Sequence, residues 1–353
     1  EEPELCRDDL LYLQYTGGTT GLSKGAMLSH GNLIANIKQY EELAKNDINY
    51  GNDIILTAIP MYHIFALSMN TLAYFTFGAS NVLVTNPRDM KSFVETWSHY
   101  DISMFTGVNT LFNGLLHTPG FAEIDFSTLK MTIGGGAPVQ SAVSDKWKEV
   151  TGKALMEGYG LSETSPVLTL NLNYVEPSIS GIGIPVPSTE ISLRDDEGKE
   201  VAPGDAGELC AKGPQVMAGY WNNDEATKDA MTTDGFFKTG DIAVLDEQGH
   251  FHIVDRKKDM ILVSGFNVYP NEIEAEAAGM DDVMECACVG VPDEKTGEAV
   301  KLFVVKTNPS LTEQDIQNYC RSRLAAYKIP KQVIFIEELP KSTVGKILRR
   351  ELR

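Results

Sequence analysis

The chain has 353 residues, of which 42% are hydrophobic and 22% are charged, and its formal net charge is −19. This composition is typical of a globular protein with a core large enough for two or more domains. The acidity argues against general nucleic-acid binding, and no apolar run reaches the length of about eighteen residues that predicts a transmembrane helix. The chain starts at Glu1, without an initiator Met or a secretory leader, so we expect a piece of a longer protein.

The five cysteines show neither metal-ligand spacing nor a disulfide framework, which favours a reducing cytoplasm. Cys286 and Cys288 lie in an apolar run and are predicted to pack as small hydrophobic residues. The charge is unevenly distributed, because residues 328–353 hold seven Lys or Arg and three Asp or Glu. A basic end on an acidic body predicts a place where an anion meets the protein.

Up to about residue 133, short apolar runs alternate with segments of helical periodicity. The first run, Leu10–Tyr15, is predicted to be a buried strand, and Ser29 is predicted to cap the first helix. The alternation indicates an α/β architecture with at least one mainly parallel sheet. The further predicted strands are 54–59, 82–84, 102–106 and 129–133, and the predicted helices are 29–44, 67–77, 93–100 and 109–116.

From about Gly181 the pattern changes to short strands separated by Gly, Pro and Asp, which predicts a β-rich subdomain over about 181–257. A charged run, Asp255–Asp259, follows, and the pattern then becomes mixed again. We therefore predict a large domain over 1–257 and a small α+β domain over 258–353. The strands predicted in these two parts are 188–194, 207–212, 286–291, 300–306 and 332–335, and the helices are 271–278 and 313–325.

A glycine-rich stretch follows the first predicted strand, with the residues Thr16, Gly17, Gly18, Thr19, Thr20, Gly21, Leu22, Ser23, Lys24 and Gly25. Glycines let backbone N–H groups approach a ligand, and the hydroxyls and the lysine add donors and positive charge, so the stretch has the chemistry of a phosphate-binding loop. It is not the P-loop of the common NTPases, which needs Gly and Lys adjacent. The alternative, a flexible linker, explains neither the lone lysine nor the flanking apolar strands.

Two further glycine-containing stretches also have two interpretations. Gly134-Gly135-Gly136-Ala137-Pro138-Val139 lacks the third small residue of a dinucleotide fingerprint, but its bare backbone could accept a flat purine; a plain strand-to-helix turn fits equally. In Glu157-Gly158-Tyr159-Gly160-Leu161-Ser162-Glu163-Thr164, a tyrosine can stack and a carboxylate can bind Mg²⁺ together with nucleotide phosphates. A structural turn fits this stretch as well.

Three more features allow a functional and a structural interpretation. Asp241 lies at a turn, where it could accept bonds from both ribose hydroxyls or could cap the turn. His63 lies in an apolar setting, either as a core histidine or beside an apolar substrate. The basic stretch Lys341–Arg350 is either a binding loop or a solvated run of charge.

Taken together and in this order, these motifs resemble those of the adenylate-forming superfamily, which comprises acyl-CoA synthetases, adenylation domains and firefly-type luciferases. The resemblance runs from about Leu10 to the end, and the stretches 13–25, 86–89 and 255–274 are most similar to bacterial long-chain fatty acid–CoA ligases. It implies a partial large domain with a parallel sheet, a β-rich subdomain and a mobile C-terminal domain. It also implies two reaction steps: a carboxylate and ATP give an acyl-adenylate and pyrophosphate, and the thiol of CoA then displaces AMP.

The resemblance implies roles for the nucleotide-binding positions. Residues 16–25 would hold the β- and γ-phosphates of ATP, Glu163 would bind Mg²⁺, and Lys24 and Thr164 would take part in catalysis. Asp241 and Arg256 would bind the ribose hydroxyls. The residues implied around adenine are Gly134, Gly135, Gly136, Ala137, Gly158, Tyr159 and Gly160.

The resemblance also implies roles in chemistry and movement. Lys346 would bridge the α-phosphate and the acyl carboxylate, because positioned cations stabilise the negative charge that builds up there. Lys258 would be the hinge that withdraws Lys346 and brings Gly265 toward a pantetheine tunnel for CoA.

Amino-acid-activating relatives place an aspartate after the position of His63, and His63–Leu67 contains none, which implies an apolar acid such as a fatty acid. The apolar helix Leu67–Phe77 is compatible with an acyl tunnel, and a fatty-acid substrate would bring peripheral membrane contact. The alternatives are another apolar or aromatic acid, an acceptor other than CoA, and a catalytically incompetent nucleotide-binding fragment. Family members carry an N-terminal block that this sequence lacks, so we expect low stability or little activity of the chain alone.

Overall fold

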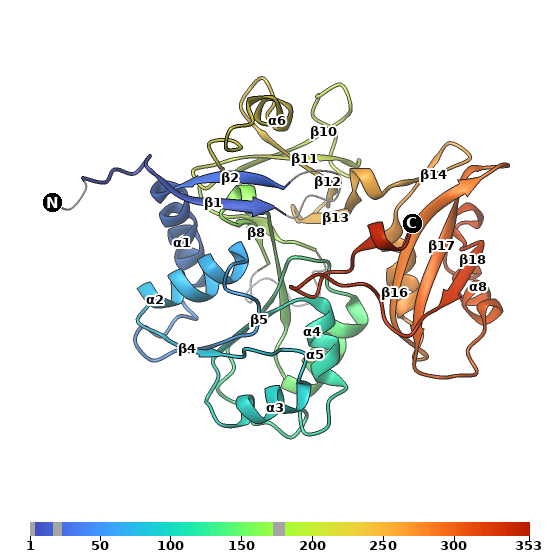
Figure 1. The fold of residues 1–353 in the computed structure, drawn as a ribbon, viewed down its shortest axis with the longest axis horizontal. Coiled ribbons are helices and arrows are strands. Elements are labelled where there is room, and N and C mark those ends of the chain that lie inside the picture. Colours follow the sequence, from blue (N-terminus) through green and yellow to red (C-terminus); the bar gives the residue numbers. More distant parts are fainter. Residues whose placement is uncertain (1–3, 17–22, 172–180) are drawn as a thin grey trace.

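The computed structural model describes residues 4–16, 23–171 and 181–353 (Figure 1). Its first elements are an antiparallel hairpin and a helix that follows without a break. The Ser29 hydroxyl accepts a hydrogen bond from the backbone N–H of Asn32, which confirms the predicted helix cap. These elements are β1 (Leu10–Thr16), β2 (Lys24–Ser29) and α1 (His30–Ala44).

The central sheet of the described residues has seven strands in the order β4-β3-β5-β6-β7-β8-β9. The pairs from β4 to β7 are parallel, as the strand–helix alternation predicts, and β8 and β9 add antiparallel pairs at one edge. The strands are β3 (Ile54–Thr57), β4 (Ser80–Leu83), β5 (Met104–Gly107), β6 (Met131–Gly134), β7 (Leu155–Gly160), β8 (Val167–Leu170) and β9 (Ile184–Pro185). The helices between them are the π-helix η1 (Ala66–Ala73), α2 (Tyr74–Thr76), α3 (Met90–Ser98), α4 (Asn109–Leu116), α5 (Ser141–Thr151) and the 3₁₀ turn η2 (Ser162–Thr164).

Helices cover both faces of this sheet and create two hydrophobic cores. Successive strand residues point to opposite faces, so Ile55 enters one core and Leu56 the other. One core lies under α1 and η1 and contains Tyr40 and Tyr74. The other, under α3, α4 and α5, contains the fully buried Trp97 and Trp147 with their neighbouring aromatic rings. These cores fix the carboxyl ends of the parallel strands, where the predicted site residues lie.

A four-stranded antiparallel sheet follows, in agreement with the predicted β-rich subdomain. Its elements are β10 (Glu190–Arg194), β11 (Gly207–Lys212), α6 (Asp224–Ala230), β12 (Phe237–Leu245) and β13 (Phe251–Arg256). We use the term C-terminal domain for the last sheet and the helices that cover it (Figure 1). Its elements are the 3₁₀ turn η3 (Lys257–Asp259), β14 (Ile261–Val263), β15 (Phe266–Val268), α7 (Pro270–Ala278), β16 (Val283–Asp293), β17 (Gly297–Lys306), α8 (Glu313–Arg321), η4 (Ala326–Lys328), β18 (Gln332–Phe335) and η5 (Arg349–Glu351).

Two elements differ from the sequence-based expectation. The strand predicted to be buried is β1, whose Leu10 and Tyr15 are 44% and 57% exposed, because β1 pairs with β2 alone and the rest of the described chain does not cover its outer side. The predicted apolar helix 67–77 begins as a π-helix. Its buried Asn70 bonds to the hydroxyls of Thr57 and Thr106, at the ends of β3 and β5.

The cysteines are all free thiols, and Cys6 is exposed while the other four are buried. Cys286, Cys288 and Cys320 lie in the core of the C-terminal domain, which confirms that the first two pack as small hydrophobic residues. Among the residues that the structure describes, no helix combines the length and the apolar character needed to cross a bilayer.

Candidate active site

Strands of two sheets bring a carboxylate, a guanidinium and a phenol together. Asp241 in β12 pairs in register with Arg256 in β13, and Arg256 Nε lies 3.5 Å from Asp241 Oδ1. Tyr159, in β7, donates a hydrogen bond of 2.7 Å to Asp241 Oδ2. Burial and the charge of Asp241 raise the pKa of Tyr159 well above its usual value, so the phenol remains a donor. The two predicted ribose ligands therefore lie beside the tyrosine predicted to stack on adenine.

The C-terminal stretch that contains Lys346 forms a tight turn against α4. The N–H of Ser342 donates to the carbonyl of Lys346 at 2.8 Å, and Thr110 of α4 donates a bond of 3.0 Å to the carbonyl of Gly345. Gly345 has a φ of +80°, and a Cβ at this position would lie 3.1 Å from Thr110 Oγ1. Both the backbone conformation and the close approach of α4 therefore require glycine here.

A second contact joins this turn to the large domain, and the charges of Asp241 and Arg256 act on Lys346. Tyr62 donates a hydrogen bond of 2.9 Å to the hydroxyl of Thr343. Burial, with the positive charge of Arg256, lowers the pKa of Lys346 to about 7, while Asp241 acts in the opposite direction. An ammonium in such surroundings is well suited to stabilise negative charge that develops nearby.

His63 lies near the same lysine. Burial, and then the charge of Lys346, lowers the pKa of His63, so its imidazole is neutral at pH 7. Its Nδ1 accepts a hydrogen bond of 3.3 Å from the N–H of Phe65. The charge of the predicted catalytic lysine therefore acts on the residue predicted beside the acyl substrate.

Glu163, the predicted Mg²⁺ ligand, and Lys24, the predicted phosphate ligand, meet at one tyrosine. Tyr220 donates a hydrogen bond of 2.8 Å to Glu163 Oε1, and Lys24 Nζ lies 5.0 Å from the centre of the same ring. Thr16 pairs in register with Lys24, so the hairpin holds both ends of the predicted phosphate loop together. The remaining predicted loop residues between them, Gly17, Gly18, Thr19, Thr20 and Gly21, lie outside the described residues; Ser23 and Gly25 are described, and Gly25 lies in β2.

Thr164 lies beside Glu163, but its hydroxyl is used within its own turn. The hydroxyl accepts a bond of 3.0 Å from the N–H of Leu161 and donates to the carbonyls of Leu161 and Pro166. A Cβ at Gly160 would lie 1.8 Å from the Pro166 carbonyl oxygen, so this turn needs glycine. The turn is therefore a packed support for the Glu163 carboxylate, and Thr164 is fully buried within it.

The predicted adenine-flanking stretches also lie side by side. A Cβ at Gly135 would lie 3.3 Å from the Gly158 carbonyl and 3.0 Å from the ring of Phe65, and Gly136 has a φ of +76°. The half-buried Glu157 is close by, with the Val139 nitrogen 3.5 Å from its Oε2. Burial raises the pKa of Glu157 to about 7, so this carboxyl group can donate as well as accept a hydrogen bond near neutral pH.

Gly265 lies away from this group of residues. It has a φ of +83° in the turn between β14 and β15, and a Cβ there would meet nothing within 4 Å. Lys258 lies in η3, and burial together with the charge of Arg256 lowers its pKa. In this arrangement Lys346 and Gly265, both predicted to act in the site, are not brought together.

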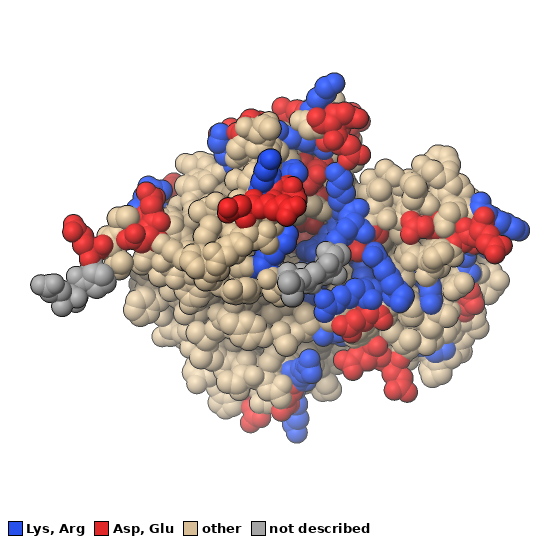
Figure 2. Space-filling view, turned by 45° about the horizontal axis from the view of Figure 1, so that its top comes forward, with Lys and Arg blue, Asp and Glu red and all other residues tan. Residues whose placement is uncertain are grey.

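Basic side chains gather where the C-terminal domain meets the rest of the chain (Figure 2). Within the described ranges, no group of three His, Cys, Asp or Glu side chains could hold a metal ion unaided. To bind Mg²⁺ as predicted, Glu163 would therefore need further oxygen atoms, such as those of a polyphosphate, to complete an octahedral shell.

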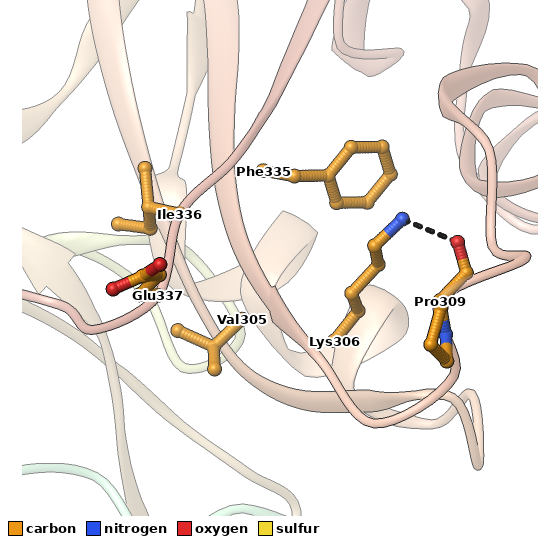
Figure 3. A pocket seen from close by; sticks show the side chains of 6 residues that line it. All are labelled: Val305, Lys306, Pro309, Phe335, Ile336 and Glu337. Carbon is orange, nitrogen blue, oxygen red and sulfur yellow. Dashed lines mark hydrogen bonds between the residues drawn. The ribbon is translucent and has the colours of Figure 1, made fainter.

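A shallow pocket of about 400 Å³ lies elsewhere, between the ends of β17 and β18 (Figure 3). The ammonium of Lys306 is already held there by the Pro309 carbonyl at 2.8 Å and lies 4.2 Å from the centre of the Phe335 ring. The pocket contains none of the predicted site residues. Its lining residues are Val305, Lys306, Pro309, Phe335, Ile336 and Glu337.

The sequence-based prediction missed Tyr220. Its neighbour Gly219 has a φ of +150°, and a Cβ there would lie 2.7 Å from the side chain of Thr227. A glycine followed by two aromatic residues, Tyr220 and Trp221, is the signal that points to such a constrained turn.

Comparison with known proteins identifies the family of this site. The model of the AMP-binding enzyme family matches residues 1–221, and that of the AMP-binding enzyme C-terminal domain matches residues 272–346. The chain belongs to the AMP-binding enzymes. The long-chain-fatty-acid–CoA ligase of Salmonella typhimurium is 54% identical over 352 residues, which cover 100% of this chain and 63% of that ligase. This AMP-binding chain thus spans less than two thirds of the length of that relative.

Solved structures confirm the predicted adenylate-forming fold of this AMP-binding enzyme. ATP-bound MatB from Rhodopseudomonas palustris has a TM-score of 0.90 at 34% identity, covering 99% of this chain and 68% of that chain. Apo MatB has a TM-score of 0.78, also at 34% identity, covering 100% of this chain and 69% of that chain. The described arrangement is therefore more similar to the ATP-bound than to the apo structure.

Proposed function

We propose that the protein containing this chain is an ATP-dependent fatty acid–CoA ligase that forms an acyl-adenylate and then an acyl-CoA. The observation that carries the proposal is the cluster of Tyr159, Asp241 and Arg256. Lys346 lies on a turn that packs on α4, and burial and the charge of Arg256 lower its pKa to about 7. The ligase from Salmonella typhimurium, 54% identical, supports the substrate class.

In the first step, an oxygen of the fatty-acid carboxylate attacks the α-phosphorus of ATP, and the bond to pyrophosphate breaks. Negative charge grows on the phosphoryl oxygens, and the Lys346 ammonium stabilises it while orienting the carboxylate. Asp241 and Arg256 hold the ribose, with Tyr159 fixing the Asp241 carboxylate at 2.7 Å. Lys24 binds the departing phosphates.

Mg²⁺ fits the residues present, because Glu163 offers one carboxylate and ATP supplies the remaining anionic oxygens. When bound, the ion would neutralise charge on the phosphates. The chain contributes the orientation of Glu163, whose Oε1 accepts a bond of 2.8 Å from Tyr220.

In the second step, the thiol of CoA loses its proton to solvent and its sulfur attacks the acyl carbon. The new C–S bond forms, and AMP leaves with the electron pair of the broken C–O bond. We propose that the C-terminal domain turns about Lys258 so that Lys346 withdraws and Gly265 lines the path of the pantetheine. The exposed position of Gly265, with open space around it, leaves it free for such a contact.

A fatty acid is favoured because no aspartate follows His63 to bind an ammonium, and because the neighbouring π-helix η1 is apolar. A cytoplasmic location with peripheral membrane contact follows from this substrate. An apolar or aromatic acid other than a fatty acid, or an acceptor other than CoA, is the second candidate. An incompetent nucleotide-binding fragment is disfavoured, since Lys24, Glu163, Asp241, Arg256 and Lys346 are all present.

The test is pyrophosphate release from ATP by the protein containing this chain, over a panel of acids, with and without CoA. Fatty-acid-dependent release followed by acyl-CoA formation is expected. Release that is independent of any carboxylic acid would end the ligase proposal. Strong acyl-CoA formation by the 353-residue chain alone would contradict our expectation that it has little activity by itself.

A further inference from the structure

Arg349, three residues after Lys346, makes more ionic contacts than its place in a short C-terminal turn would suggest. Its side chain is 17% exposed. Arg349 Nη2 donates bonds of 2.7 Å to Glu274 and 2.6 Å to Asn271. Arg349 Nε donates to Glu274 at 3.0 Å and Nη1 to Asp255 at 3.3 Å. All three guanidinium nitrogens are therefore engaged.

These partners lie on both sides of the proposed hinge at Lys258. Asp255 belongs to β13 and precedes it, whereas Asn271 and Glu274 belong to α7 and follow it. One guanidinium thus connects the C-terminal turn to the large domain and to the C-terminal domain at once.

The carboxylates around Arg349 are built into the fold. Asp255 also accepts a bond of 2.8 Å from the backbone N–H of Asn271, and Glu274 accepts one of 2.7 Å from that of Cys288. Burial raises the pKa values of Asp255 and Glu274, and the charge of Arg349 opposes both shifts. A planar guanidinium can serve two carboxylates at fixed angles, which a lysine ammonium cannot do.

A second ionic contact holds the other end of the same stretch but does not cross the hinge. Lys341 Nζ lies 2.8 Å and 2.9 Å from the two oxygens of Glu285, in β16. Both residues belong to the C-terminal domain. Of these two contacts, only that of Arg349 depends on how the C-terminal domain is oriented against β13.

We propose that Arg349 is a positioning residue for adenylation, which holds Lys346 opposite Asp241 and Arg256 by joining the C-terminal turn to Asp255 across the hinge. The inference rests on the proposed function, because it assumes that Lys346 acts in the first step. Rotation about Lys258 breaks the Arg349–Asp255 bond, while the bonds to Glu274 and Asn271 move with the domain. Arg349 therefore favours the first step and is not needed in the second.

The experiment compares Arg349→Lys and Asp255→Asn with Lys346→Ala and with the matched control Lys341→Gln, in the protein that contains this chain. The two half-reactions are measured separately: pyrophosphate release with ATP and the best fatty acid, and acyl-CoA formation from pre-made acyl-adenylate. We expect Arg349→Lys to lower the first half-reaction by about 10- to 100-fold, since misplacing a catalytic group by about 1 Å has effects of this size. We expect Asp255→Asn to lower it less, Lys341→Gln to leave it within about twofold, and all three to spare the second half-reaction.

The pH profile adds a measurement that a merely structural role would not change. If Arg349→Lys lets Lys346 move toward solvent, its pKa rises, and the alkaline limb of kcat/KM for adenylation moves to higher pH; Lys341→Gln leaves this limb in place. Asp255→Asn retains an oxygen that can accept the hydrogen bond from the backbone N–H of Asn271. This variant serves as the test if Arg349→Lys does not fold.

Full adenylation by both Arg349→Lys and Asp255→Asn, with Lys346→Ala inactive, would overturn the inference and leave the proposed function intact. An equal loss in both half-reactions with an unmoved pH profile would also overturn it, since that is a general structural effect. Full adenylation by Lys346→Ala would instead refute the role assigned to Lys346.

Discussion

The hydroxyl of Tyr220 donates a hydrogen bond of 2.8 Å to the carboxylate of Glu163, although the two residues are 57 positions apart. The ammonium of Lys24 lies 5.0 Å from the centre of the same ring. One side chain thereby sets the distance between the residue proposed to bind Mg²⁺ and the residue proposed to bind phosphate.

Replacing Tyr220 by Phe removes the hydroxyl that orients the Glu163 carboxylate but keeps the aromatic ring. We expect the apparent affinity for Mg²⁺, measured by titrating pyrophosphate release, to fall by about tenfold, as is usual when a ligand loses its outer hydrogen-bond partner. Saturating Mg²⁺ should restore most of the rate. An unchanged Mg²⁺ titration would show that Glu163 needs no orienting partner. Tyr220→Leu is the matched control, because it also removes the face on which Lys24 lies.

The lowered pKa of Lys346 has a consequence for stability with a defined sign. The pKa falls from its usual value of about 10.5 in the unfolded chain to about 7 on folding, so between these values the unfolded chain binds a proton that the folded chain does not. Lys346 therefore destabilises the folded chain at pH 7, and the free energy of unfolding increases as the pH rises across this window. Lys346→Met should have a higher Tm at pH 7, with an advantage that shrinks toward pH 10. A lower Tm at pH 7 would mean that the ammonium is not destabilising in the folded state.

The bond from Thr110 to the Gly345 carbonyl should matter for adenylation alone. Thr110→Val keeps the shape and removes the donor, and a hydrogen bond of this kind contributes about 1 kcal/mol, so we expect about a fivefold loss in pyrophosphate release. Acyl-CoA formation from pre-made acyl-adenylate should be unaffected, because the contact exists only while the turn lies on α4. Thr110→Ser, which keeps the hydroxyl, is the control. Equal losses in both half-reactions would contradict the prediction.

Gly160 should be the least replaceable glycine of the turn that supports Glu163. A Cβ there would lie 1.8 Å from the Pro166 carbonyl oxygen, so Gly160→Ala must displace the backbone. We expect a loss of about 2–4 kcal/mol in the free energy of unfolding, measured by urea denaturation. Gly152→Ala is the comparison, because its φ is +72° but its Cβ would meet nothing within 4 Å. It should cost only about 1 kcal/mol. A similar loss in both would contradict the prediction, because it would mean that the close contact at Gly160 adds nothing.

The sequence patterns predicted helices and strands correctly where polar residues flank a short apolar segment. Helix α4 (Asn109–Leu116) and strands β11 (Gly207–Lys212) and β18 (Gln332–Phe335) match the predicted limits. The prediction was wrong for the burial of β1, because an apolar run does not say what covers it. It also missed the π-helix, because the buried bonds of Asn70 depend on two strands that are distant in sequence.

The candidate site was predicted only where a residue belongs to a recognisable motif. Asp241, Arg256 and Lys346 lie in such motifs; the structure places Arg256 Nε 3.5 Å from Asp241, and the charges of both residues act on the pKa of Lys346. Tyr220 and Arg349 were missed as partners because their contacts join residues 57 and 75 to 94 positions apart. Glu157 was noticed only as part of a stretch, because the elevation of its pKa arises from burial, which no local pattern reports.

The distribution of thiols makes the proposed domain rotation observable. Cys6 is exposed, while burial raises the pKa of Cys210 to about 11 and those of Cys286 and Cys288 well above their usual value. A maleimide fluorophore should therefore react first at Cys6. With Ser322→Cys supplying a second exposed thiol at the end of α8, energy transfer between two dyes would follow the C-terminal domain through both reaction steps, with every native cysteine left in place.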